Sequence, residues 1–229
     1  MKLNKDSKKV WIDYFPLTVT AIALIVLGII FEQKFIKLCP TLISLVVMLL
    51  SAHANRFAFL LGGCNSLLYS IGYIMEKLYP SALSAILISF PFQIASFILW
   101  SKNQTKDKEV RVKKMNKKTA IITSVLSVAS WIIFYFIYER LGTSNLILDN
   151  TTFVLGIITT VLSMLRYKEF VYLSAINLII DTIKWGIITI GNIANITYLI
   201  YSFYALYRQI QATYTWETLY KTQNNVTLK

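Results

Sequence analysis

Long apolar runs separated by short blocks of charge constrain this chain more than any other feature of its sequence. Hydrophobic residues make up 56% of the 229 positions and charged residues 15%, whereas a soluble domain carries about 25% charged residues. The runs reach the roughly 20 residues that span a bilayer core. We therefore expect an all-α polytopic membrane protein whose partner is the lipid bilayer. The net charge of +12 does not indicate nucleic acid, because the basic residues lie between the spans.

Eight spans are expected, in the order one, three, one, three. The first apolar run has no small-x-small cleavage site, so we interpret it as a retained helix. The spans cover about 15–31, 38–52, 57–75, 82–100, 119–138, 151–165, 170–190 and 192–207. The predicted organisation is an N-terminus (1–14), an extra helix (15–31), a first three-helix bundle (38–100), a basic linker (101–118), a linking helix (119–138), a second three-helix bundle (149–207) and a tail (208–229) that we expect to be frayed.

The distribution of basic residues predicts the orientation. With the N-terminus inside, the inner segments hold 18 of the 23 Lys and Arg residues and the outer loops hold four, while Lys184 lies within a span. This asymmetry follows the positive-inside rule. We expect a multi-pass protein of the cytoplasmic membrane with both termini in the cytoplasm.

The two triplets of spans read as parallel repeats. Each begins with a short span, followed by a basic turn (53–56 and 166–169) and a longer span. Asn65 is followed eight residues later by Tyr73, and Asn177 is followed eight residues later by Trp185. Parallel repeats about an axis along the membrane normal are a known transporter design.

Four spans carry a stripe of polar residues at helical spacing, and each stripe occupies one face. The stripes are Asn65, Tyr69, Tyr73 and Glu76; Ser89, Gln93, Ser96 and Trp100; Thr152, Gly156, Thr159 and Ser163; and Asn177, Asp181, Lys184 and Trp185. Polar groups are costly in hydrocarbon unless they face a bundle interior or water, so we predict one shared polar cavity. The candidate substrate-binding residues are Asn65, Tyr69, Tyr73, Gln93, Thr159, Ser163, Asn177, Asp181 and Trp185.

Structural interpretations of the same residues remain open. Serine, threonine and asparagine can serve only as hydrogen-bonding contacts between helices. Asp181 and Lys184 could form an ion pair at i, i+3, or Lys184 could snorkel to the interface. We interpret the tyrosines near the ends of spans as belt residues and the two cysteines as buried small hydrophobes. These tyrosines and cysteines are Tyr135, Tyr138, Tyr201, Tyr204, Tyr207, Cys39 and Cys64.

Short motifs in both halves resemble the PnuC family of vitamin transporters. The first half carries Asn55-Arg56-Phe57, then Gly63 to Tyr69, Lys77-Leu78-Tyr79, Gln93 and Trp100; the second carries Asp149, Arg166, Lys168, Glu169 and Asn177. The resemblance covers about 38–207 and implies a fold like that of the SWEET sugar transporters, with two three-helix bundles, a linking helix and, as in some members, an extra first helix. It also implies a homotrimer that carries nicotinamide riboside, thiamine or riboflavin by facilitated diffusion, with trapping by an intracellular kinase.

One departure from the family concerns aromatic residues. The family carries Trp-x-x-Trp just before the second asparagine, where this chain has Phe170 and Leu173. An aromatic ring to stack on the substrate would then come from Trp185 or Tyr73. Substrate identity is therefore less firmly implied than membership.

The available side chains suit a neutral or singly charged heterocyclic nucleoside. Amides match ribose hydroxyls or a carboxamide, an aromatic face attracts a cationic ring, and Asp181 could balance a pyridinium. A phosphorylated substrate would need several cations, and only Lys184 lies in a span.

Other classes of protein fit less well. A substrate-binding subunit of an importer that works with a separate ATPase remains an alternative. The chain itself has no G-x-x-x-x-G-K-[ST] loop for ATP. A membrane enzyme is disfavoured because the single histidine, His53, is joined by no nucleophile motif, and a purely structural protein is a further alternative. We expect no catalytic residue, metal or cofactor.

Overall fold

The computed structural model describes residues 5–75, 85–105, 109–140 and 145–227, and within them the secondary structure is helical apart from isolated bridges. The elements are α1 (Lys5–Ile30), α2 (Phe35–Ala52), α3 (Phe57–Met75), η1 (Ala85–Ser89, a π-helical turn), α5 (Phe90–Lys102), α6 (Lys117–Arg140), α7 (Leu146–Met164), α8 (Phe170–Gly191), η2 (Ile193–Asn195, a 3₁₀ turn) and α9 (Ile196–Thr227).

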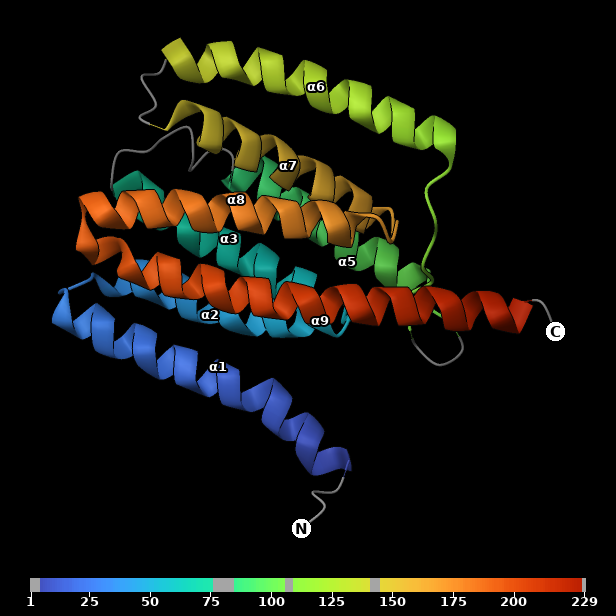
Figure 1. Cartoon of the computed structure of the whole chain (residues 1–229), viewed down its shortest axis with the longest axis horizontal. Coiled ribbons are helices and arrows are strands. Elements are labelled where there is room, and N and C mark those ends of the chain that lie inside the picture. Colours follow the sequence, from blue (N-terminus) through green and yellow to red (C-terminus); the bar gives the residue numbers. More distant parts are fainter. Residues whose placement is uncertain (1–4, 76–84, 106–108, 141–144, 228–229) are drawn as a thin grey trace.

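Six helices form a closed ring. Each packs on the next in the order α2, α3, α5, α7, α8, α9, and α9 packs again on α2. The ring thus joins one triplet (α2, α3, η1–α5) to a second (α7, α8, α9), while α6 packs on α7 and α1 packs on α2 and α9 (Figure 1). The expected fold of two three-helix bundles with a linking helix and an extra N-terminal helix is confirmed.

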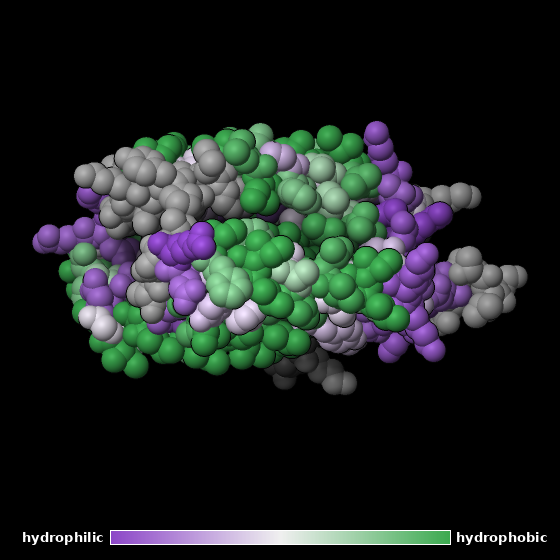
Figure 2. Space-filling view, turned by 90° about the horizontal axis from the view of Figure 1, so that it is seen from above, coloured by the Kyte–Doolittle hydropathy of each residue, from purple (hydrophilic) through white to green (hydrophobic). Residues whose placement is uncertain are grey.

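The outer surface is suited to lipid. Five helical segments of the described chain are long and apolar enough to cross a membrane, and two shorter apolar helices accompany them. Along α6 the apolar side chains face outward, and none of its residues is buried. Figure 2 shows hydrophobic residues over most of the middle of one face and hydrophilic residues gathered at both ends. The chain is a multi-pass membrane protein.

In both triplets the first helix ends in the same kind of turn. After α2, Ala54 adopts a positive φ of 51°, and its N–H and that of Asn55 bond back to Ser51 and Leu50. After α7, the positive φ of 67° falls on Arg166, and the bonds run from Arg166 and Tyr167 back to Ser163 and Leu162. These are Schellman caps, which satisfy the last carbonyls of a helix. The predicted repeat therefore extends to backbone hydrogen bonds.

The C-terminal segment is helical, which corrects the prediction of a frayed tail. α9 continues to Thr227 and carries Trp216, which is fully buried against Trp100, Phe170 and the linker residue Val112. The linker was predicted only as a basic segment, yet its residues Val110 and Val112 are buried in this cluster. Trp216 is the one tryptophan in this polar stretch, and its buried ring packs the C-terminal part of α9 against the linker cluster. We call this end of the bundle, with both Schellman turns and the segment 103–116, the linker end.

Helix α7 begins earlier than the expected start at 151. Asp149 and Asn150 precede the expected span, but both lie within the helix. Asn150 is fully buried and its Nδ2 donates to the Trp131 carbonyl of α6 at 2.8 Å. Tertiary partners of these two side chains thus override the sequence pattern.

Candidate functional site

A chain of polar side chains crosses the ring of helices. Asn65 of α3 is buried, and its Nδ2 donates to the Pro40 carbonyl and to Ser44 Oγ of α2, each at 2.9 Å. Ser44 Oγ lies 3.3 Å from the Tyr69 hydroxyl. Tyr201 of α9 lies against Ser44 and interacts electrostatically with Tyr69 and with Asp181 of α8. Three of the predicted residues are therefore linked through Ser44 and Tyr201.

Tyr201 and Tyr204 correct the prediction of a tyrosine belt. Tyr204 is buried, and its hydroxyl donates to the Leu45 carbonyl at 3.0 Å. Both rings pack in one cluster with Leu24 and Leu45. Because α9 continues well beyond the expected end of the span, these tyrosines do not lie at the end of the helix. Their position along the chain also could not show which face of the helix they occupy.

Asn177 occupies the position in α8 that Asn65 occupies in α3, but its surroundings differ. A Cβ atom added to Gly156 of α7 would lie 3.9 Å from Asn177 Nδ2. Gly156 stands at the repeat position of Ser44 and offers no hydroxyl. Asn177 Oδ1 is buried and has no hydrogen-bond partner among the described residues. Asn65 Oδ1 is likewise buried without such a partner, and an unsatisfied buried acceptor costs about 1–3 kcal/mol. Asn177 is the better candidate for binding a ligand because it lies next to Gly156, which lines a cavity.

A cavity of about 260 Å³ lies beside Gly156, between η1–α5 of the first bundle and α7 of the second. Ligand pockets commonly have volumes of roughly 300–1,000 Å³, so this cavity is near the lower end. Its lining is Ile88, Ser89, Phe92, Thr152, Phe153, Gly156, Ile157 and Thr160. It lies where the two bundles meet.

A charge cluster lies next to this cavity. Lys184 Nζ is 2.8 Å from Asp181 Oδ1, 3.6 Å from Asp149 Oδ1 and 3.4 Å from Thr152 Oγ1. The predicted i, i+3 pair is thus confirmed, and the Lys184 side chain is only 13% exposed. With all three groups ionised, two carboxylates and one ammonium leave one net negative charge. Such an excess would favour a cationic ligand.

Trp185 supplies an aromatic surface beside the cluster. Its ring stacks on Tyr198 of α9 with centroids 4.5 Å apart and an interplanar angle of 19°. Phe170, where the family carries tryptophan, packs instead against Trp216 at the linker end, with centroids 4.6 Å apart. Trp185, and not Phe170, therefore lies next to the charge cluster.

The remaining predicted residues are divided. Gln93 lies against Gly62 and Gly63 of α3, since a Cβ on Gly62 would be 3.2 Å from its Nε2. Thr159 Oγ1 donates to the Gly156 carbonyl of its own helix at 3.0 Å. The buried Ser163 contributes its carbonyl, which accepts from Trp100 Nε1 at 2.9 Å. The side chain of Tyr73 and all of Glu76 lie outside the described residues.

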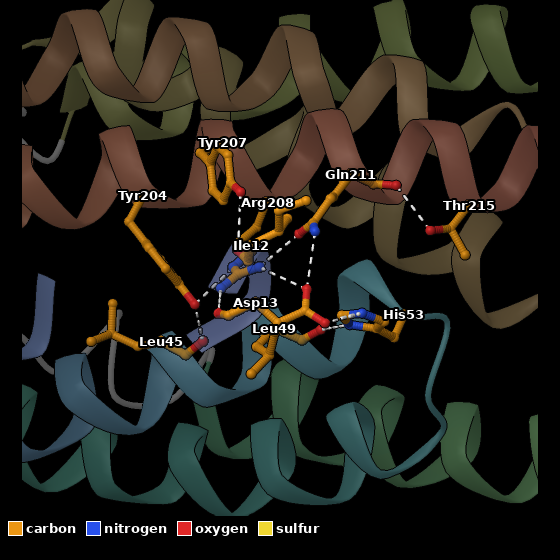
Figure 3. Close-up of polar contacts among 10 residues, drawn as sticks. All are labelled: Ile12, Asp13, Leu45, Leu49, His53, Tyr204, Tyr207, Arg208, Gln211 and Thr215. Carbon is orange, nitrogen blue, oxygen red and sulfur yellow. Dashed lines mark hydrogen bonds and ion pairs between the residues drawn. The ribbon is translucent and has the colours of Figure 1, made fainter. Parts of the chain in front are cut away.

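A second polar network joins α1, α2 and α9 towards the linker end (Figure 3). Arg208 is fully buried, and its guanidinium donates to the Asp13 carbonyl, to Gln211 Oε1 at 2.7 Å and to the Tyr204 hydroxyl at 3.0 Å. His53 Nε2 lies 3.1 Å from Asp13 Oδ2. The donors and acceptors are paired, so this network serves to dock α1.

Both cysteines are free, but Cys64 is exposed on α3 rather than buried as predicted. An exposed position on a membrane helix is itself apolar in surroundings, so burial in the protein was not required. The described residues contain no group of three or more His, Cys, Asp or Glu that could hold a metal.

Sequence reasoning missed residues that only the packing identifies. Ser44, Tyr201, Asp149 and Tyr198 contact the predicted site residues, and Gly156, predicted only as part of a stripe, matters through its missing side chain. Comparison of the repeats could have found Gly156, because it aligns with Ser44 when Asn177 is aligned with Asn65.

The fold and the site together define a class. Repeated three-helix bundles in a membrane, with buried polar groups where they meet, are the architecture of a small-solute transporter. The sequence profile described as nicotinamide mononucleotide transporter matches residues 34–218. This protein belongs to that family, which consists of transporters and not of enzymes.

Two individual relatives support this assignment. The nicotinamide riboside transporter PnuC of Neisseria mucosa is 27% identical over 116 residues, which are 48% of this chain and 44% of that protein. The alignment therefore spans less than half of the curated relative. The crystal structure of the vitamin B3 transporter PnuC matches with a TM-score of 0.75 at 19% identity, over 96% of this chain and 94% of that one. At this identity the match concerns the fold.

Proposed function

We propose that this protein carries a vitamin-type heterocyclic nucleoside across the cytoplasmic membrane, with nicotinamide riboside as the first candidate. The observation that carries the proposal is the buried Asn177 amide, whose Oδ1 has no partner among the described residues. It lies beside Gly156 and the cavity between the bundles. Membership of a transporter family supports the same role.

The chemistry of the site favours a ring that carries a positive charge or a carboxamide. The Asn177 oxygen can accept a hydrogen bond from a carboxamide or a ribose hydroxyl. Asp181 and Asp149 share one ammonium, which leaves a negative charge for a pyridinium. Trp185 offers a ring face, and a cation over such a face gains roughly 0.5–2 kcal/mol.

The proposed mechanism is uncoupled alternating access, with the substrate bound between the bundles and trapped by phosphorylation inside the cell. The described residues hold few acids in the spans, and the two near the cavity already contact Lys184. The excess of basic residues at the linker end supports a cytoplasmic location of both termini. The outward apolar faces of α6 and α1 leave room for a homotrimer.

Uptake into proteoliposomes tests this function. Radiolabelled nicotinamide riboside should equilibrate across liposomes that hold the wild-type protein, and collapse of a sodium or proton gradient should leave the rate unchanged. Asn177→Ala should reduce uptake at least tenfold. Calorimetry with nicotinamide riboside, thiamine, riboflavin and a deoxynucleoside identifies the substrate among these classes.

Two results would contradict the proposal. Undiminished uptake by Asn177→Ala would place the substrate site elsewhere. Transport that appears only with a co-purified ATPase would make the chain a subunit of an ATP-driven importer.

A further inference from the structure

Arg166 stands where a glycine would be expected. It occupies the left-handed position of the Schellman cap after α7, with φ of 67°. Glycine is the usual residue there, because a side chain makes this conformation unfavourable. The equivalent turn of the first bundle carries a small residue, Ala54. A strained backbone under a long charged side chain points to a use for that side chain.

The Arg166 guanidinium is buried without a matching acid. The residue is 7% exposed, and its Nη1 has no hydrogen-bond partner among the described residues. Glu169, the acid of the same turn, uses its Oε2 to accept the backbone N–H of Met115 at 3.0 Å. A buried guanidinium donor without an acceptor is costly, and an anion would remove that cost.

Two further cations are held beside Arg166 by the linker. The Lys113 N–H donates to the Arg166 carbonyl at 2.8 Å, and Lys168 N–H donates to the Lys113 carbonyl at 2.9 Å. Side chains alternate along an extended segment. Since Val112 is buried in the tryptophan cluster, Arg111 and Lys113 face the opposite side, and both are exposed.

The electrostatics of the three groups agree with this geometry. Burial lowers the pKa of Arg166, and the charge of Arg111 lowers that pKa further. Burial also lowers the pKa of Lys113, with a second contribution from Arg166. The buried Arg166 and the two exposed cations beside it therefore repel one another, and a bound anion would relieve the repulsion.

We propose that Arg166, Arg111 and Lys113 form a binding site for a phosphate group at the linker end. A guanidinium fork matches the oxygens of a phosphate, and the neighbouring cations add charge. The phosphate comes either from a soluble phosphate ester or from an acidic lipid headgroup. The site is separate from the cavity between the bundles, and only its location on the cytoplasmic side rests on the proposed orientation.

The first bundle offers no such site at the matching turn. Arg56 Nη1 donates to Gln104 Oε1 at 3.1 Å, and its guanidinium lies over the rings of Phe57 and Phe97. Lys168 pairs with Glu217 at 2.5 Å. The site is therefore specific to the turn after α7 and to the linker that crosses it.

Thermal melting of the full-length protein in detergent tests the site. Sodium phosphate and a nucleoside 5′-monophosphate, each compared with sodium chloride at equal ionic strength, should raise the melting temperature in a saturable way. Arg166→Gly should abolish this shift and yet melt higher than the wild type in chloride, because glycine suits the left-handed backbone. Arg111→Gln should weaken the shift. Lys114→Gln, which removes a neighbouring exposed charge, should leave it unchanged.

Nanodiscs distinguish the two sources of phosphate. If soluble phosphates give no shift, acidic phospholipid should stabilise the wild type relative to neutral lipid, and Arg166→Gly should lose that difference. The proposal is overturned if neither source stabilises the protein, or if the stabilisation persists in Arg166→Gly. A lower melting temperature of Arg166→Gly in chloride also overturns it, because the guanidinium would then be part of the fold.

Discussion

The two three-helix bundles share a backbone plan but differ in how they treat the same asparagine. In the first bundle, Asn65 donates to Ser44 and to the Pro40 carbonyl, so its amide joins two helices. In the second, Asn177 Nδ2 faces Gly156, which offers no hydroxyl. The Oδ1 atoms of both asparagines are buried without a hydrogen-bond partner among the described residues, so the two copies differ at the amide nitrogen. One missing hydroxymethyl group thus removes from the second copy the hydroxyl acceptor that joins two helices in the first.

The difference continues along the two helices. Where α3 carries Tyr69, hydrogen-bonded to Ser44, α8 carries Asp181, paired with Lys184. At the turns, the first bundle carries Ala54 and the second Arg166. At these matched positions the second bundle therefore carries charged side chains, while the first bundle carries neutral ones. The following experiments test this division.

The largest effect is expected at the charge cluster. Lys184→Met leaves two carboxylates near each other without a cation, and breaking a buried ion pair costs roughly 3–5 kcal/mol. We expect the unfolding free energy to fall by about 3 kcal/mol, measured by denaturation in detergent. Tyr69→Phe, at the repeat position of Asp181 in the first bundle, should cost about 1 kcal/mol. Equal stability of Lys184→Met and the wild type would mean that the cluster is solvated.

The two asparagines should separate stability from transport. Asn65→Ala removes a donor shared by two acceptors of α2 and should cost about 2 kcal/mol of stability, while substrate affinity changes little. Asn177→Ala should keep the melting temperature of the wild type and lose substrate affinity by a similar free energy. Melting curves and calorimetry on the same preparations measure both. If the two variants behave alike, the division between the bundles is wrong.

A serine at Gly156 should give Asn177 the hydroxyl partner that Ser44 gives Asn65 in the first bundle. In Gly156→Ser, the new Cβ would lie 3.9 Å from Asn177 Nδ2, an ordinary contact that brings a hydroxyl within reach of the amide. We expect about tenfold weaker substrate binding, or about 1.4 kcal/mol, without loss of stability. Gly186→Ser is the control, because a Cβ there meets nothing within 4 Å. Unchanged binding in Gly156→Ser would separate Asn177 from the substrate.

The smallest effect concerns pH and the second turn. A hydrogen bond from Lys168, followed by one from Tyr172, lowers the pKa of Glu217. Its contribution is therefore present above the unfolded carboxyl pKa of about 4.3 and is lost as the pH falls through the folded value. Glu217→Gln should remove about 0.5 kcal/mol near neutral pH and flatten the acid limb of the stability curve. Arg56→Gln should leave that limb unchanged, since its partner Gln104 does not titrate.

Much of the fold could be predicted from the sequence because hydrocarbon imposes strict rules. Apolar length determined the spans, and the odd helix between the triplets made parallel repeats possible. The boundaries failed where polar side chains found tertiary partners, as for Asp149 with Lys184 and for Asn150 with Trp131. The prediction of a frayed tail was wrong for a related reason. Trp216 is fully buried, and its packing partners lie far from it along the chain, where no sequence pattern identifies them.

The candidate site was predicted as a set of stripes, and the structure sorted the stripes into roles. Asn65 and Tyr69 are joined through Ser44, which no helical periodicity had selected. Gly156 matters through what it lacks, and periodicity cannot weigh an absent side chain. The prediction that Trp185 or Tyr73 supplies the aromatic ring stays a prediction, while Phe170 packs with Trp216 at the linker end.

The sequence alone determined that this chain crosses a membrane repeatedly and that its two halves repeat, because both properties depend on transfer free energy and periodicity along the chain. Which asparagine nitrogen meets a hydroxyl on the facing helix was decided only by the tertiary structure. Hydrogen bonding is directional and short-ranged, so it depends on the helix that faces each amide and not on the amide's own place in the chain.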